Sequence, residues 1–358
     1  MGNWYAFDSI GEGIAKARGL LRGPGLFGKW MKLAVLVFIV SLLSGGWGGL
    51  DYRASDSDAT QFAGVLNQAA AVPSEIIIIA IIAAIAAALI VGAIFGLVRN
   101  VFFFATLESI TTGQAKIFGY LGKFAGLAVS LTLFEIVLAL ITLPFGIAFA
   151  LSIAGMLLMF GLLPAALTSA IYAVPVLGGI ATFASNPLAI VAMGIIGALG
   201  IAILAAVNYI KGQFAEYMMY MHGHRAFDAF KRSAGLVRRN LAQVIILLFA
   251  QFLLLIAIGI ISVICAAIFF GPPVIAGLLI GGALGITGML SNPIVAVLAA
   301  LVAGAVFLIA AFLMNLVLTP VKIFTYFFNL AVLEKMSGGG AVITVAKGAK
   351  GWPKGDPR

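Results

Sequence analysis

The residue with the clearest chemical potential is Glu135, which lies within the otherwise apolar run "SLTLFEIVLALITLPFG" at residues 130–146. A carboxylate inside a membrane-spanning helix is costly to ionise and is by default a candidate functional group. Its chemistry would be the binding of an ion, the relay of a proton, or a hydrogen bond that joins two helices. A partly hydrated carboxylate is a further interpretation.

Two other polar side chains occupy positions equivalent to Glu135. Glu135, Gln251 and Ser41 each follow a basic residue by 12 positions, which corresponds to about 18 Å of helical rise. If these residues face one another, Glu135 can be protonated and hydrogen-bond to Gln251. The spacing therefore predicts an intramembrane polar layer in which a helix-joining role is favoured over an ion or proton relay. The preceding basic residue is Lys123 for Glu135, Arg239 for Gln251 and Lys29 for Ser41.

The composition identifies the elements that must position these groups. Hydrophobic residues make up 63% of the 358 positions and charged residues only 9%, and the mean hydropathy is +1.19. A soluble domain carries about 25% charged residues, so a soluble fold is excluded. The run at 76–97 exceeds the roughly 20 apolar residues that cross a bilayer, and such runs must be helical. The sequence thus predicts an all-α integral membrane protein.

Six full-length spans are predicted, joined on the outer side by connections of very different character. The connections at 145–187 and 271–293 contain no charged residue, so we expect two apolar re-entrant or partly inserted helical hairpins. If the connection at 145–187 crosses the bilayer and returns instead, the chain has eight spans. The six spans lie at 31–46, 75–98, 124–144, 188–210, 242–268 and 294–318.

The basic residues indicate the orientation of these spans. Cytoplasmic flanks retain Lys and Arg, and of the 21 basic residues only Arg53 falls on the opposite side of the six predicted spans. Both termini are therefore expected to be cytoplasmic. The net charge of +9 reports this topology rather than a nucleic-acid partner.

Three parallel helix-pair repeats are predicted within a single membrane domain at 1–336, with units at about 5–105, 106–222 and 223–336. The second helices of the last two units begin with the same "SNP", at 185–187 and 291–293. The alternative is that apolar helices resemble one another by composition alone. The basic tail at 337–358 is expected to be flexible. The asparagines at the inner ends of the second helices are Asn100, Asn208 and Asn315.

Each predicted repeat starts with a basic amphipathic segment that is expected to lie on the inner membrane surface. The side chains predicted to bind anionic headgroups are Lys16, Arg18, Arg22, Lys116, Lys123, Lys231, Arg232, Arg238 and Arg239.

Other chemistry finds little support in the sequence. His222 and His224 are two residues apart and have no acid or Cys at ligand spacing, so no metal site is predicted. No nucleophile set or phosphate-binding loop is recognisable, so we expect no enzyme activity and no cofactor. The single cysteine, Cys265, is interpreted as a small buried hydrophobic residue.

The helix pairs, the basic interfacial segments and the closing "LTPVKIFTYFFNLAVLEKM" resemble a group of prokaryotic and archaeal six-helix membrane proteins. That group is similar to the membrane domain of some glycerophosphodiester phosphodiesterases. The resemblance implies a six-helix membrane fold in a prokaryotic plasma membrane and no catalytic residues.

The resulting hypothesis is a non-catalytic membrane scaffold or accessory subunit that binds other membrane proteins, or itself, together with anionic lipid. The alternative is a transporter or channel that uses the polar layer at Glu135, Gln251 and Ser41.

Overall fold

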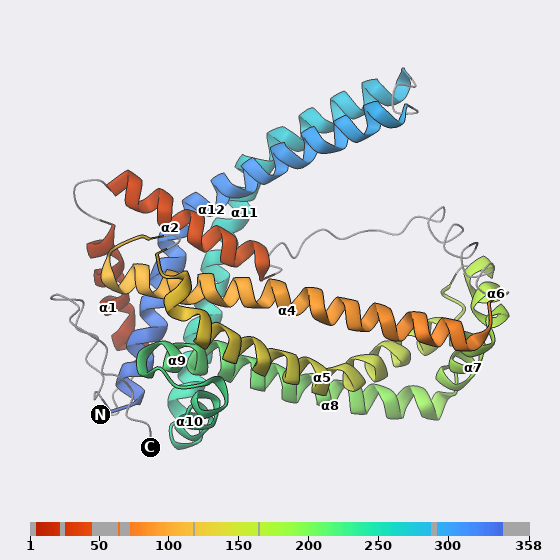
Figure 1. Cartoon of the computed structure of the whole chain (residues 1–358), viewed down its shortest axis with the longest axis horizontal. Helices are drawn as coiled ribbons and strands as arrows, with labels where there is room; N and C mark the ends of the chain where they lie inside the picture. Colours follow the sequence, from red (N-terminus) through yellow and green to blue (C-terminus); the bar gives the residue numbers. More distant parts are fainter. Residues whose placement is uncertain are drawn as a thin grey trace. The chain divides into compact units, whose positions relative to one another are not determined.

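The computed structural model describes residues 5–21, 26–44, 64, 72–116, 119–163, 165–287 and 292–338. All regular elements within these ranges are helical (Figure 1). They form two compact units built from non-consecutive segments, 1–44, 99–128 and 213–358 in the first unit and 45–98 and 129–212 in the second. These units do not coincide with the predicted repeats, which remain a prediction.

Among the described residues, five helices are long and apolar enough to cross a membrane, and they lie at five of the six predicted spans. The sixth, predicted at 31–46, corresponds to α2 (Leu26–Leu43), an 18-residue helix whose first turns carry Lys29 and Lys32. It is not among the five, so six spans are not confirmed. The five helices are α4 (Ser74–Thr112), α5 (Leu121–Met159), α8 (Pro187–Ile210), α11 (Leu241–Ile286) and α12 (Pro293–Met336).

Most of these helices are longer than a bilayer requires. The 39 residues of α4 extend roughly 58 Å, about twice the thickness of the hydrocarbon layer. The burial of residues along α12 shows what the additional helix length does in the first unit. Its early part is exposed, with Leu301 at 64%, whereas Ile323 is fully buried. The protein therefore buries the last part of α12 and leaves the first part exposed, as expected for contact with lipid.

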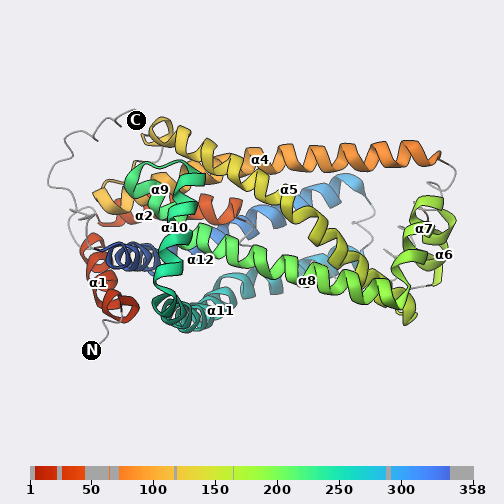
Figure 2. The ribbon, with the colours of Figure 1, turned by 90° about the horizontal axis from the view of Figure 1, so that it is seen from below.

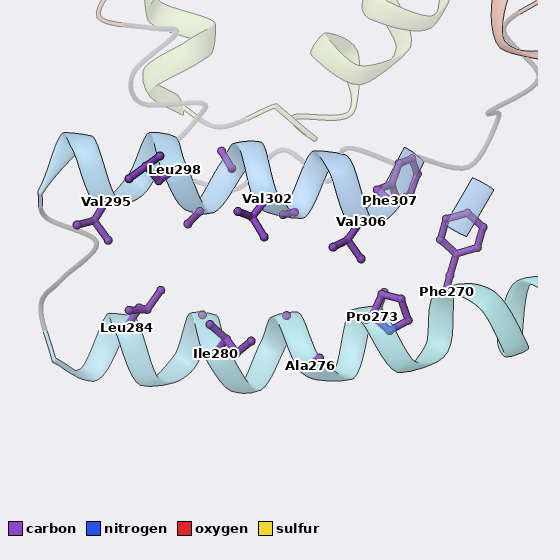
Figure 3. Close-up of a pocket in the computed structure, with 16 residues that line it drawn as sticks. Phe270, Pro273, Ala276, Ile280, Leu284, Val295, Leu298, Val302, Val306 and Phe307 are labelled. Carbon is purple, nitrogen blue, oxygen red and sulfur yellow. The ribbon is translucent and has the colours of Figure 1, made fainter. Parts of the chain in front are cut away.

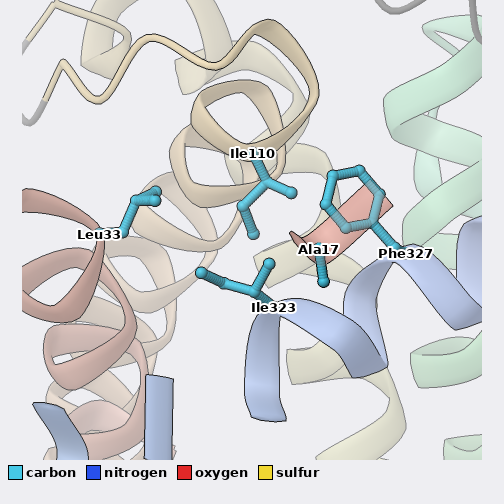
Figure 4. Packing of buried hydrophobic residues seen from close by; sticks show 5 residues of the cluster. All are labelled: Ala17, Leu33, Ile110, Ile323 and Phe327. Atoms are coloured by element: carbon cyan, nitrogen blue, oxygen red, sulfur yellow. The ribbon is translucent and has the colours of Figure 1, made fainter. Parts of the chain in front are cut away.

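The core of the first unit forms where four helices meet around the end of α12. Ala17 of α1 (Tyr5–Leu20), Leu33 of α2 and Ile110 of α4 pack against Ile323 and Phe327 (Figure 4). The helix α1 also lies along α12 at Gly13, where an added Cβ would lie 3.3 Å from the backbone nitrogen of Phe328. Small residues thus allow close contact between these two helices.

Two short helices complete this unit beside the long ones. The helix α9 (Glu216–His222) ends at Gly223, whose φ of 69° suits a glycine, and α10 (Ala226–Arg239) follows directly. The α10 side that packs on the protein carries Ala226, Ala229 and Ser233. Its basic side chains are left exposed.

In the second unit, α5 and α8 run antiparallel and approach closely (Figure 2). An added Cβ at Gly197 or Gly200 would lie less than 3 Å from Phe149 or Phe145, respectively. The Ser152 hydroxyl donates a 2.9 Å hydrogen bond to the carbonyl oxygen of Ile190. Glycines at three-residue intervals therefore bring the two backbones together.

The two charge-free connections are largely helical. The helix α5 continues to Met159, and the short helices α6 (Ala165–Ala173) and α7 (Pro175–Ala184) pack together before α8 begins. The helix α11 continues through Pro272 and Pro273 to Ile286. Most of the second connection is therefore an extension of the α11–α12 pair, and insertion of either segment into a membrane stays a prediction.

The asparagine and proline of the two "SNP" sequences have the same local structure. Asn186 and Asn292 precede α8 and α12, and each side-chain oxygen accepts a 3.0 Å hydrogen bond from the backbone two residues later. A proline occupies the first position of each helix, where its missing N–H costs nothing. This detail agrees with the predicted repeat, although it does not establish three equivalent units.

The buried end of α12 should determine the stability of the first unit. We expect Ile323→Ala to lower the free energy of unfolding by about 2–5 kcal/mol, because it leaves a cavity between four helices. Ile309→Ala is the matched control, since Ile309 is 60% exposed on the same helix. Unfolding of the purified protein in mixed micelles with increasing dodecyl sulfate measures both. Equal losses from the two substitutions would contradict this assignment of the core.

Candidate functional site: polar side chains within the apolar helices

In the second unit, Glu135 forms an ion pair with Lys211. The amine of Lys211 lies 2.7 Å from Oε1 of Glu135, and the two side chains are only 13% and 18% exposed, respectively. The carboxylate lies beside Gly96, where an added Cβ would be in ordinary van der Waals contact with Oε2 at 3.6 Å. The Lys211 amine forms a charge-assisted hydrogen bond with Glu135, whereas the sequence suggested Gln251 as the hydrogen-bond partner of this carboxyl group.

The ion pair lies at one end of the α5–α8 contact. Along the antiparallel helices, Glu135 is level with Lys211, Phe145 with Gly200, and Ser152 with Ile190. Beyond the ion pair the described residues of both helices carry no charge. The 24 residues of α8 alone extend roughly 36 Å, enough to cross the hydrocarbon layer. The charges therefore lie at the base of an apolar helix pair.

In the first unit, Ser41 accepts a hydrogen bond from Lys322. The Lys322 amine donates to Oγ of Ser41 and to Oδ1 of Asn315, each at 2.7 Å. The Asn315 amide in turn donates a 3.0 Å bond to the carbonyl oxygen of Ala34. These contacts join α2 to α12.

Gln251, also in the first unit, belongs to a separate amide network. Its side-chain nitrogen donates to Oδ1 of Asn329 at 3.3 Å and to Oε1 of Gln213 at 2.9 Å. The Asn329 amide donates to the hydroxyl of Tyr217 at 3.1 Å. The network therefore joins α11 to α12 and to the end of the α8–α9 segment.

Glu108 is the centre of a further polar group in the first unit. Its carboxylate accepts hydrogen bonds from the Lys123 amine at 2.6 Å and from the Tyr220 hydroxyl at 2.9 Å. Thr111 shares a hydrogen bond with Tyr220. The Lys123 amine also lies 5.1 Å from the centre of the Phe124 ring. Lys123, which was predicted to bind headgroups, thus contacts side chains of the protein itself.

The predicted polar layer is divided among different partners. Ser41 and Gln251 lie in the same unit but hydrogen-bond to different side chains, and Glu135 pairs with Lys211 in the other unit. Each residue is a helix-joining group within its own unit. Convergence of Glu135 with the other two stays a prediction.

Lys211 and Lys322 are the functional side chains that the sequence interpretation missed, because both were assigned to the cytoplasmic flank. A usable signal was present. Lys211 lies 3 residues after Asn208, and Lys322 lies 7 residues after Asn315. Positions three, four and seven apart share a helix face, so each lysine is on the same face as its asparagine. Asn315 is buried, whereas Asn208 is exposed.

Asn100 is buried as well, at the point where α4 enters the first unit. Its side-chain oxygen accepts hydrogen bonds from the Arg99 guanidinium at 2.9 and 3.1 Å. Two of the three predicted span-end asparagines are therefore inside the protein.

A local departure from α-helical geometry follows α8. A single π-helical turn, η1 (Lys211–Ala215), connects α8 to α9 and contains both Lys211 and Gln213. Such turns are frequent at functional sites because they redirect the side chains that follow. Here the turn carries two of the residues that pair with the predicted polar layer.

Most of the predicted headgroup-binding side chains are exposed. On α10, Lys231, Arg232, Arg238 and Arg239 are all exposed, as are Arg18 and Lys116, whereas Arg22 lies outside the described residues. Lys16 pairs with Glu12 at 2.6 Å, and hydrogen bonding from Lys16 is the main cause of the lowered pKa of Glu12.

The two histidines stack on each other just after α9. The rings of His222 and His224 are parallel, with their centres 5.6 Å apart. Burial lowers the pKa of His224, and Arg232 adds to the effect. Among the described residues, no three His, Cys, Asp or Glu side chains gather in an arrangement that could hold a metal ion.

An apolar groove separates α11 from α12 beyond their aromatic contact at Phe270 and Phe307 (Figure 3). Its volume is about 780 Å³, and every lining residue is apolar. Gly277 and Gly281 face it, and an added Cβ at either position would meet no atom within 4 Å. The groove thus leaves a surface of small residues uncovered.

Long apolar helices with polar groups paired inside them define this chain as a helical, multi-pass membrane protein. The profile of the Family of unknown function (DUF7544) matches residues 4–343, so the chain belongs to that family. No curated protein and no solved structure matches it.

The Glu135–Lys211 ion pair should show strong coupling in a double-mutant cycle. Either Glu135→Gln or Lys211→Met leaves a partly buried charge without its partner, and we expect each to lower the free energy of unfolding by roughly 3 kcal/mol. The double variant should lose less than the sum of the two, because no such charge remains. Unfolding in mixed micelles provides the measurement. Additive losses would show that the pair has no energetic coupling.

Proposed function

We propose that this protein is a non-catalytic membrane scaffold or accessory subunit in a prokaryotic plasma membrane. Its apolar helix pairs would hold a helix of a partner membrane protein, and its basic interfacial helices would hold anionic lipid. Both termini would face the cytoplasm. The observation that carries the proposal is the apolar groove on the charge-free part of the α11–α12 pair.

The groove has the properties of an unfilled helix-packing surface. Gly277 and Gly281 are four residues apart, the spacing at which two membrane helices approach closely. Small residues from α12, Ala299 and Ala303, line the opposite side. Because helix association in lipid depends on close van der Waals packing, such a surface gains more from a helix than a smooth apolar face would.

The polar networks support a structural rather than a catalytic role. Glu135 pairs with Lys211, and Gln251 pairs with Gln213 and Asn329. These bonds join helices, which is a common use of polar side chains inside a membrane. The exposed basic side of α10 suits contact with anionic headgroups, each Lys or Arg contributing about 1 kcal/mol near the surface.

Site-directed photo-cross-linking in native membranes tests the groove. We expect a photoreactive residue at Ala303, which lines the groove, to give one discrete protein adduct. The matched position Ile275 is 62% exposed outside the groove and should label lipid only. Gly281→Leu should reduce the Ala303 adduct about tenfold, the effect of losing 1.4 kcal/mol of packing.

The same protein should co-purify with the wild-type chain in a fixed ratio and be lost with Gly281→Leu. Identical adducts from both positions, or an Ala303 adduct that Gly281→Leu leaves unchanged, would contradict the proposed docking surface.

A transporter or channel is the second candidate, and the charged pair between α5 and α8 is the observation that favours it. Under the scaffold proposal, proteoliposomes with the wild-type chain should show the same proton and ion flux as protein-free vesicles. Flux above that background that disappears with Glu135→Gln, while Thr142→Val on the same helix retains it, would favour transport. Fluorescent pH and membrane-potential dyes report the flux.

A further inference from the structure

Lys322 has an unusual setting for a lysine near the end of a membrane helix. Such side chains normally extend toward the water interface. The Lys322 amine instead reaches Asn315, two turns earlier in α12 and therefore nearer the exposed apolar part of that helix. Its second partner is the Ser41 hydroxyl on α2. The positive charge is thus held at the base of the apolar α11–α12 pair.

Both partners are neutral acceptors with fixed orientations. The Ser41 hydroxyl donates its own proton to the carbonyl oxygen of Val37 at 2.8 Å, which leaves a lone pair for Lys322. The Asn315 amide donates to Ala34, which directs Oδ1 toward the amine. An ammonium group has three hydrogens, and these acceptors take two. Neither partner carries a negative charge.

No carboxylate in the described part of the chain forms an ion pair with Lys322. A charge taken out of water is costly unless a charge of opposite sign accompanies it. Of the carboxylates in the same unit, Glu12 and Glu108 pair with other lysines, and no ion pair joins the buried Glu216 or any other described carboxylate to Lys322. The partly buried Lys322 amine is therefore left without a carboxylate partner among the described residues.

We propose that Lys322, oriented by Ser41 and Asn315, is a specific binding site for one phosphate group. The third hydrogen of the ammonium would donate to a phosphate oxygen, completing a charge-assisted pair. A phosphate could come from the headgroup of an anionic lipid or from a soluble phosphate. The site is distinct from the exposed basic residues of α10, and it stands whether the protein acts as a scaffold or as a transporter.

The position of Lys322 along α12 favours the lipid source. Before it, Leu313 and Val317 are 39% and 44% exposed, as expected for residues in contact with acyl chains, whereas Leu318, Thr319 and Ile323 are buried against the protein. The indole nitrogen of Trp30 donates a 3.1 Å hydrogen bond to the carbonyl oxygen of Leu316 nearby. Tryptophan is enriched at the headgroup level of membranes. Lys322 therefore occupies the level at which a headgroup phosphate enters.

Native mass spectrometry of the delipidated full chain, titrated with phosphatidylglycerol in non-ionic detergent, tests the site. We expect one tight lipid adduct that Lys322→Gln weakens by about tenfold or more, as loss of a charge-assisted hydrogen bond predicts. Lys322→Arg keeps the charge and should retain the adduct. Lys32→Gln, which removes an exposed charge from α2, is the matched control and should change the affinity less than twofold.

Two further measurements separate the outcomes. Inorganic phosphate that displaces the lipid adduct at millimolar concentration would assign the site to soluble phosphate, and a lack of competition would assign it to lipid. Thermal unfolding and size-exclusion profiles of each variant report whether it remains folded. Equal lipid and phosphate binding by folded Lys322→Gln and wild type would overturn the proposal, as would loss of binding in Lys322→Arg and Lys32→Gln alike.

Discussion

Charged and amide side chains in apolar helices need partners inside the protein, and much of this structure depends on how that requirement is met. Within a bilayer no water compensates an unpaired polar group. Each such side chain therefore packs against a helix that carries a hydrogen-bond or ion-pair partner for it. The ion pair between Glu135 and Lys211 joins α5 to the end of α8. Ser41 and Asn315 accept hydrogen bonds from Lys322, and the bond to Ser41 joins α2 to α12. Gln251 sets α11 against α12 through Asn329.

These contacts lie where the helices change their surroundings. The helix α12 is exposed along its first part and becomes progressively buried between Ala310 and Phe327, and Lys322 lies within this transition. In the second unit the Glu135–Lys211 pair lies at the base of an apolar helix pair, and the described residues of α5 after Glu135 and of α8 carry no charge. Helices much longer than a bilayer can thus serve as both membrane spans and parts of a packed protein core.

The α11–α12 pair combines two surfaces of different chemistry. The groove at Gly277 and Gly281 is apolar and shaped for close packing, whereas Lys322 offers a localised positive charge. A groove of that kind distinguishes a partner helix from lipid tails by shape and packing. Hydrophobicity alone cannot do so, because lipid tails are as apolar as the side chains that line the groove. The amine discriminates by charge and geometry. A scaffold that must hold both protein and lipid would use two such surfaces.

The sequence by itself determined the helical membrane class, five helices apolar enough to span a bilayer, and the starts of α8 and α12, because composition and proline-asparagine signals act locally. It also identified Glu135, Gln251 and Ser41 as polar groups inside helices. Only the tertiary structure decided their partners. Lys211 and Lys322 resemble flank residues in the sequence, since positive charge alone does not distinguish a headgroup ligand from an internal partner. That choice depends on which helix lies opposite, and helix pairing is a property of the packed chain.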